Sequence, residues 1–336
     1  MKAAAPTRLH GHFAGLTSFE VALILALMLI SPFLVPTRQV KADDTTTSLS
    51  TGGTPMGIAY DPQGGKLFIA TASAVVVTDG SAWVIDTIPS SSSMQFPCSL
   101  VYVPTTNEVF VANCGGDASR AITIIDARTD AIVGTIPLME QPFGIAYDSN
   151  TDQVFVADST GAVYVIDVQA RQVVQAIQVP SGHYGILFDP DTNEVYVSNA
   201  DNDTVSVISD SSYSIVATVK VGTFPMGMGV DTTRGLVFVA NFVNGTVSAI
   251  AEGNHSVVRT VNVGWMPSGV AVDPCTGMAY VSNGDNYSMV EFDTSSYAST
   301  PRFVSGSTLG APLFVPETGQ MYVPCVAAGE VAMFAA

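Results

Sequence analysis

The sequence is poor in charge, and poorest in positive charge. Of its 336 residues only 12% are charged, and 12 Lys and Arg stand against 29 Asp and Glu, a formal net charge of −17. Nucleic-acid partners need a basic surface, so this balance excludes them. Because 47% of the residues are hydrophobic, the composition also excludes a disordered chain and favours strands buried on both faces.

Helical periodicity is missing as well. Residues 183–224 contain four short apolar runs, at Gly185–Asp189, Val195–Ser198, Thr204–Ser209 and Ile215–Val221. Each is four to seven residues long, rich in Val, Ile and Tyr, and bounded by Gly, Pro, Asn or Asp. These features predict strands joined by hairpin turns, whereas a helix needs a longer run with a 3.6-residue period.

The four-strand segment is repeated along the chain. A Pro or its substitute, followed by a Gly-apolar-Ala-apolar-Asp pattern, begins seven units spaced by 41 to 45 residues. The units begin at Pro55, Pro97, Pro142, His183, Pro225, Pro267 and Pro312. A period near 40 with four strands per unit is typical of a β-propeller, so the sequence predicts an all-β fold of seven four-stranded antiparallel blades.

The last unit has only three strands, whereas residues 45–54 resemble a strand that precedes the first unit. An open ring would expose a long strand edge, which proteins avoid. We therefore expect the N-terminal strand to complete the seventh blade and close one domain over residues 43–336.

Residues 1–42 differ in character from the rest of the chain. Basic residues precede an apolar run at 21–35, and Ala42 precedes Asp43. The pattern predicts a secretory signal peptide cleaved after Ala42. Two alternatives remain open: an uncleaved membrane anchor, and a type IV pilin leader cut after Gly15, with Glu20 five residues beyond the cut. All three predict export, to the medium or to the extracellular face of the envelope, with membrane contact only through this segment.

The repeat motifs resemble those of a known family. Pro-x-Gly-Ile-Ala-Tyr-Asp-Pro, Val-Tyr-Val-Ser-Asn and Asp-Thr-Val-Ser-Val-Ile are similar to the repeats of YVTN-type β-propellers, found in archaeal surface-layer and bacterial secreted proteins. The resemblance covers nearly all of residues 45–336, and the units that begin at Pro97 and Pro312 depart from it most. It implies a non-enzymatic role in cell-surface binding and adhesion. Fold alone does not assign an activity.

Propeller enzymes form the alternative class. The same fold is similar to that of lactonases, lyases and the copper domain of nitrous oxide reductase, but only His183 and His255 follow residue 42. Two imidazoles cannot build a multinuclear copper cluster. His183 replaces a unit-opening proline, and it could act as an acid or base at the channel mouth, although a structural role is the simpler interpretation. We predict no cofactor, metal or catalytic residue.

The candidate ligand-binding residues lie in the loops that lead into the innermost strands. Apolar and aromatic side chains on such loops are costly to leave in water, and a rim of them would form a binding platform, although several could pack between blades instead. The rim consists of Met56, Phe96, Phe143, His183, Tyr184, Phe224, Met226, Trp265 and Met266. We expect it to bind an envelope protein, a glycan or a small hydrophobic ligand. A pilin-like filament subunit that carries the propeller is a further alternative.

The sequence also contains a cysteine pair and a recurring aspartate. Cys98 and Cys114 fall one step from directly opposite across a hairpin, so a disulfide between them is feasible in an oxidising compartment. An Asp recurs where several innermost strands end, at Asp61, Asp148, Asp189, Asp231 and Asp273. The five could gather a cation, but acceptance of hydrogen bonds from their own turns is the favoured interpretation.

Overall fold

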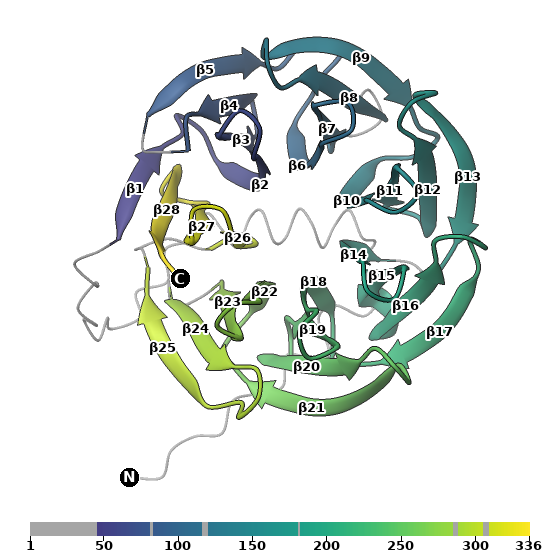
Figure 1. The fold of residues 1–336 in the computed structure, drawn as a ribbon, viewed down its shortest axis with the longest axis vertical. Helices are drawn as coiled ribbons and strands as arrows, with labels where there is room; N and C mark the ends of the chain where they lie inside the picture. The colour runs from purple at the N-terminus through teal and green to yellow at the C-terminus, as the bar shows by residue number, and fades with distance from the viewer. Residues whose placement is uncertain (1–45, 81–82, 116–119, 181, 285–287, 305–308) are drawn as a thin grey trace. The chain divides into compact units, whose positions relative to one another are not determined.

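The computed structural model describes residues 46–80, 83–115, 120–180, 182–284, 288–304 and 309–336. Within them lie 28 strands in seven four-stranded antiparallel sheets, which stand around a common axis (Figure 1). The chain is therefore a seven-bladed β-propeller, as the repeats predict. The predicted leader, residues 1–42, lies outside the described residues.

The first six blades run in chain order from the innermost to the outermost strand. Blade one comprises β2 (Pro55–Asp61), β3 (Lys66–Thr71), β4 (Ala74–Thr78) and β5 (Val84–Pro89). Blade two comprises β6 (Pro97–Val103), β7 (Glu108–Asn113), β8 (Ala121–Asp126) and β9 (Ala131–Pro137). Blade three comprises β10 (Pro142–Asp148), β11 (Gln153–Asp158), β12 (Ala162–Asp167) and β13 (Gln172–Gln178).

Blade four comprises β14 (His183–Asp189), β15 (Glu194–Asn199), β16 (Thr204–Ser209) and β17 (Ile215–Lys220), with a short 3₁₀ turn, η1 (Ala200–Asn202), before β16. Blade five comprises β18 (Pro225–Asp231), β19 (Leu236–Asn241), β20 (Thr246–Ala251) and β21 (Ser256–Asn262). Blade six comprises β22 (Pro267–Asp273), β23 (Met278–Asn283), β24 (Ser288–Asp293) and β25 (Ser299–Phe303).

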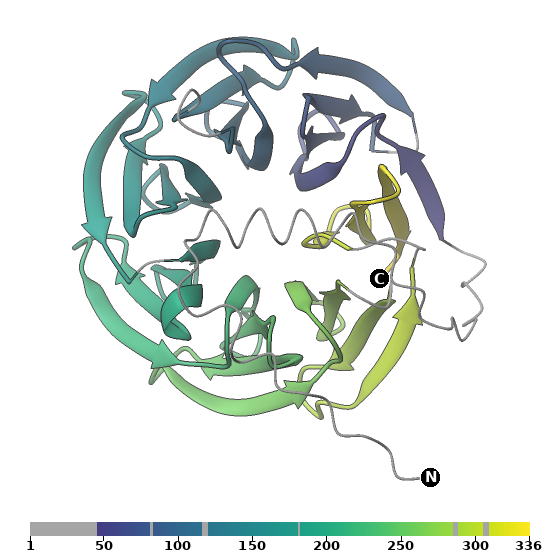
Figure 2. The same cartoon turned by 180° about the vertical axis from the view of Figure 1, so that it is seen from behind.

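Blade seven is built from both ends of the propeller. Its strands β26 (Leu313–Val315), β27 (Gln320–Cys325) and β28 (Glu330–Ala335) are completed by β1 (Thr47–Ser50), which pairs antiparallel with β28. Leu49 faces Val331 in this register and is buried. The predicted closure is confirmed, and Figure 2 shows the same ring from behind.

The core is divided among the contacts between neighbouring blades. Each second strand is almost fully buried, for example Phe110 in β7 and Phe238 in β19. The blades meet closely near the axis, where the repeat carries glycine. A Cβ on Gly57 or Gly227 would lie 2.8 Å from a backbone oxygen of the next blade, so any larger residue would push the innermost strands apart.

Candidate functional site

Two sets of loops form one end of the ring, which we call the mouth face: the lead-in loops before the innermost strands, and the loops between second and third strands. They share an end because neighbouring strands run antiparallel. Backbone hydrogen bonds join them in five blades. The bonds are Cys114 N to Phe96 O (2.9 Å), Ser159 N to Gln141 O (3.1 Å), Ala200 N to Gly182 O (2.7 Å), Phe242 N to Phe224 O (3.0 Å) and Gly284 N to Met266 O (2.9 Å). The predicted rim residues lie on this face.

Three rim residues have left-handed backbone. Phe96, Phe224 and Met266 directly precede the prolines that open blades two, five and six, with φ of 51°, 58° and 56°. Gly182 occupies the equivalent position before blade four, with φ 83°. Glycine accepts this conformation freely, whereas bulky side chains pay a steric cost there. Strain of this kind persists where the surrounding structure fixes it, and it often accompanies a function.

A second group of rim residues lies in β-bulges. The register of the innermost strand shifts after Pro55, Pro142 and Pro225, and Met56, Phe143 and Met226 lie within these shifts. A bulge redirects a side chain out of the regular alternation, and bulges are common beside binding sites. All three side chains are half-buried.

The rim is unevenly exposed. Trp265 is 59% exposed and Phe96 is 40% exposed, whereas the ring of Phe224 lies against that of Phe242, with centroids 5.9 Å apart. His183 begins β14, where it pairs with Asn199. The side chains of His183 and Tyr184 lie outside what the structure describes, so their predicted roles stay predictions.

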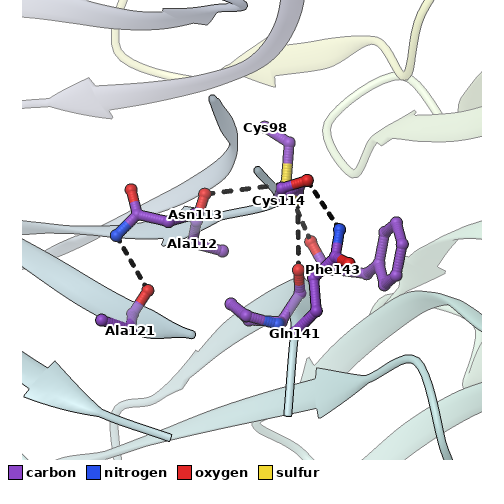
Figure 3. The surroundings of a disulfide bond; sticks show 8 residues. Cys98, Ala112, Asn113, Cys114, Ala121, Gln141 and Phe143 are labelled. Carbon is purple, nitrogen blue, oxygen red and sulfur yellow. Dashed lines mark hydrogen bonds between the residues drawn. A yellow bond between two sulfur atoms is a disulfide. The ribbon is translucent and has the colours of Figure 1, made fainter. Parts of the chain in front are cut away.

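A disulfide links Cys98 and Cys114 on the mouth face of blade two (Figure 3). Cys98 lies in the bulge of β6, Cys114 directly follows β7, and their Cα atoms are 5.9 Å apart. The Gln141 side chain donates to Cys114 O at 2.6 Å, which ties this loop to blade three. Cys275 is exposed and Cys325 buried, and both are free thiols.

A groove opens between the outer edges of blades four and five, close to the lead-in loop that carries Phe224. Its volume is about 340 Å³, and its polar lining groups are Lys220, Asn244, Thr246, Ser248 and Thr260. Lys220 Nζ lies 3.2 Å from an Asp203 carboxylate oxygen. Hydroxyl, amide and ammonium groups of this kind can hydrogen-bond a polar ligand.

The recurring aspartates act within their own turns. Asp61 accepts hydrogen bonds from the backbone N–H of Gln63 and Gly64, and Asp273 accepts them from Cys275 and Thr276. Their carboxylates therefore stabilise hairpin turns. Among the described residues, no group of three or more His, Cys, Asp or Glu side chains could hold a metal ion.

Sequence reasoning missed a set of contacts at the opposite end, which we call the hairpin face: the turns between first and second strands and between third and fourth strands. Here a residue of one blade contacts the residue that begins the second strand of the preceding blade. The pairs are Asp130–Lys66, Arg171–Glu108, Tyr213–Gln153 and His255–Glu194. The repeat register contains the signal, since each pair joins the same two repeat positions.

These observations define the class: a closed seven-bladed propeller with a partly exposed apolar rim on one face. No family model matches the chain, and a search of curated proteins finds no similar sequence. The solved structures that match comprise 1851 chains, among them a chain in a crystal structure of the mitotic checkpoint complex. That chain superimposes with a TM-score of 0.77 at 13% identity, over 91% of this chain and 96% of that one. At this identity the likeness shows the fold alone.

Among the described residues, the structure contains no helix with the length and hydrophobicity needed to cross a bilayer.

Proposed function

We propose that the protein is an exported, non-enzymatic propeller of the YVTN type that binds a partner at the cell surface through its mouth face. One observation carries the proposal: Phe96, Phe224 and Met266 hold bulky apolar side chains in left-handed backbone at equivalent positions of three loops. A sequence under pressure for stability alone would place Gly or Asn there.

A protein of the cell envelope is the partner that this surface fits best. Exposed aromatic side chains on a rigid scaffold are the residues that anchor protein interfaces. Trp265 and Phe96 are the most exposed aromatic side chains of the rim that the structure describes. The similar fold in the mitotic checkpoint complex is consistent with a propeller used as a binding scaffold.

The groove between blades four and five supports a second candidate, a glycan. Its lining of hydroxyl and amide groups would hydrogen-bond sugar hydroxyls, and the Phe224–Phe242 ring pair lies at its blade-five lead-in loop. Lys220→Ala and Thr260→Val would abolish retention on a glycan array if this candidate is correct. They would leave retention of an envelope protein unchanged.

The two tryptophans allow a matched test. Trp265 lies on the mouth face and is 59% exposed, whereas Trp83 precedes β5 on the hairpin face and is 74% exposed. We expect Trp265→Ser and Phe96→Ser to reduce co-sedimentation of the purified protein with isolated cell envelopes at least tenfold. Trp83→Ser should have no effect. Equal losses for both tryptophans, or no loss for Trp265→Ser and Phe96→Ser, would contradict the mouth-face proposal.

Two further measurements separate the remaining alternatives. A stoichiometric divalent ion in the purified protein would favour the lactonase- or lyase-like enzyme, with its site at the channel mouth. N-terminal sequencing of the mature protein distinguishes secretion, with a start at Asp43, from a pilin-like filament subunit, with a start at Leu16.

A further inference from the structure

One repeat position brings neighbouring blades together on the hairpin face. It is the residue that directly follows each third strand, and its backbone N–H is bound to the first hairpin of its own blade. Asp210 N donates to Asn193 O (3.2 Å), Glu252 N to Gly235 O (3.1 Å) and Thr294 N to Gly277 O (2.9 Å). These residues belong to blades four, five and six, and they are structurally equivalent.

The contact between blades five and six shows what this position does. Thr294 Oγ1 donates a hydrogen bond of 2.6 Å to Asp231 Oδ2, where β18 of blade five ends. Asp231 is completely buried, and Arg234 Nη1 lies 3.1 Å from the same carboxylate oxygen. A hydroxyl and a guanidinium therefore satisfy this ionised carboxylate.

The two preceding contacts have carboxyl groups on both sides. Asp189, where β14 ends, lies within hydrogen-bonding reach of Glu252. Asp210 occupies the position equivalent to Glu252 and Thr294, and the negative charge of Asp148, where β10 ends, acts on it. Glu252 is 7% exposed, the other three are also buried, and Glu252 Oε1 has no hydrogen-bond partner in the described part of the chain. Two ionised carboxylates cannot share a buried contact without a large electrostatic cost.

We propose that each pair holds one proton, so that a carboxylic acid of one blade donates to the carboxylate of its neighbour. Blade four supplies Asp189 to one pair and Asp210 to the other. A proton therefore bridges this blade to each of its neighbours, and the two bridges are lost in alkaline solution. The inference does not depend on what the mouth face binds.

The charges around the pairs agree with this assignment. The pKa of Glu252 is raised to about 7, mainly by burial and to a smaller extent by the negative charges of Asp189 and Asp191. Burial, followed by Asp148, raises the pKa of Asp210. Each raised pKa means that the native state retains a proton that the unfolded chain releases. This stability is fully present below the ordinary carboxyl pKa and is lost as the pH rises through the native value.

The other groups around Glu252 do not supply a compensating cation. Glu194, which begins β15, adds a further negative charge near Glu252. The Tyr196 hydroxyl donates a hydrogen bond of 3.1 Å to Glu194 Oε2. His255 Nε2 lies 3.0 Å from Glu194 Oε2, and Arg234 is paired with Asp231. Ser211 is the polar neighbour that hydrogen-bonds Asp210.

Equilibrium unfolding of the full chain in urea between pH 5 and pH 8 tests the proposal. Within pH 5–7 the unfolding equilibrium constant of the unmodified protein should rise by up to about tenfold per pH unit for each pair that titrates. Glu252→Gln keeps a donor for Asp189 and should remove the contribution of that pair to the slope. Glu252→Thr copies the blade-five contact and should do the same. Thr294→Val, the matched control, should lower stability without changing the slope.

Three results would overturn the inference. One is an unchanged pH slope in Glu252→Gln. Another is stabilisation of the unmodified protein at pH 8 by millimolar Ca²⁺ that Glu252→Gln abolishes, because the pair would then hold a cation instead of a proton. The third applies even if the variants do not fold: the carboxyl ¹³C resonance of Glu252 in the unmodified protein should titrate near neutral pH, and an ordinary acidic titration would exclude a retained proton.

Discussion

The two faces of the ring use left-handed backbone for different purposes. In the first hairpin turn of every blade on the hairpin face, the left-handed residue is Gly, Asn or Asp, the types that tolerate this conformation. These residues are Gly65, Asn107, Asp152, Asn193, Gly235, Gly277 and Gly319. Left-handed residues also occur there in the turns before the outer strands, and four of them contact the preceding blade: Asp130, Arg171, Tyr213 and His255.

The mouth face differs in what the strained residue contacts. The backbone carbonyl oxygens of Phe96, Phe224 and Met266 accept hydrogen bonds from the loops between second and third strands of their own blades. The side chain of Phe96 is 40% exposed to water. Strain on the hairpin face is offset by contacts that bind blade to blade. Strain on the mouth face involves apolar side chains that are exposed or half-exposed, which is why we propose that face as the binding surface.

The largest expected effect concerns the covalent link on the mouth face. Replacing both Cys98 and Cys114 with Ser removes a disulfide that closes a loop with a sequence separation of 16. Loop-closure entropy predicts a loss of about 3 kcal/mol in the free energy of unfolding. Urea unfolding under non-reducing conditions measures it. Cys275→Ser, at an exposed free thiol, should leave stability unchanged, and an equal loss in that variant would refute the assignment.

The contacts between blades on the hairpin face should come next. Arg171→Ala leaves the buried Glu108 carboxylate without its guanidinium partner. We expect a loss of about 2 kcal/mol, below the usual range for a fully buried pair because the arginine is partly exposed. Lys220→Ala, which breaks the exposed pair with Asp203, should cost less than about 0.5 kcal/mol. Similar losses in the two variants would show that the Arg171–Glu108 contact between blades contributes no more to stability than an exposed ion pair.

Much of the fold could be predicted from the repeat. Six predicted blade starts coincide with the first residue of an innermost strand. In blade seven the innermost strand, β26, begins at Leu313, one residue beyond the predicted Pro312. The repeated glycine reflects the close approach of neighbouring blades, since a Cβ on Gly57 would lie 2.8 Å from the backbone oxygen of Cys98. The closing strand was predictable because an unpaired sheet edge is unfavourable.

The site was less predictable than the fold. The repeat places Phe96 and Met266 on lead-in loops, but neither the left-handed backbone nor the exposed fraction of each side chain can be read from residue type. The pairs between blades were missed because their members lie about one and a half repeats apart and differ in chemistry: Asp231 meets Thr294, whereas Asp189 meets Glu252. In blade two the innermost strand, β6, ends in Val103 instead of Asp. The residue that follows the third strand of blade three, at the position that Thr294 and Glu252 occupy in their blades, is Val168, and Val103 and Val168 are buried in one hydrophobic cluster.

A third expected effect, smaller than the losses expected for the disulfide and for Arg171→Ala, separates the two uses of strain most directly. Phe96→Gly relieves a left-handed backbone at a partly exposed side chain, so stability should rise by about 1 kcal/mol while envelope binding falls. Tyr213→Gly relieves the same conformation on the hairpin face, but it removes the hydrogen bonds between the Tyr213 hydroxyl and Gln153 and should lower stability. Thermal unfolding and envelope co-sedimentation of the two variants measure both quantities. If Phe96→Gly were destabilising and bound normally, Phe96 would be a packing residue, and the rim would lose its strongest support as a binding surface.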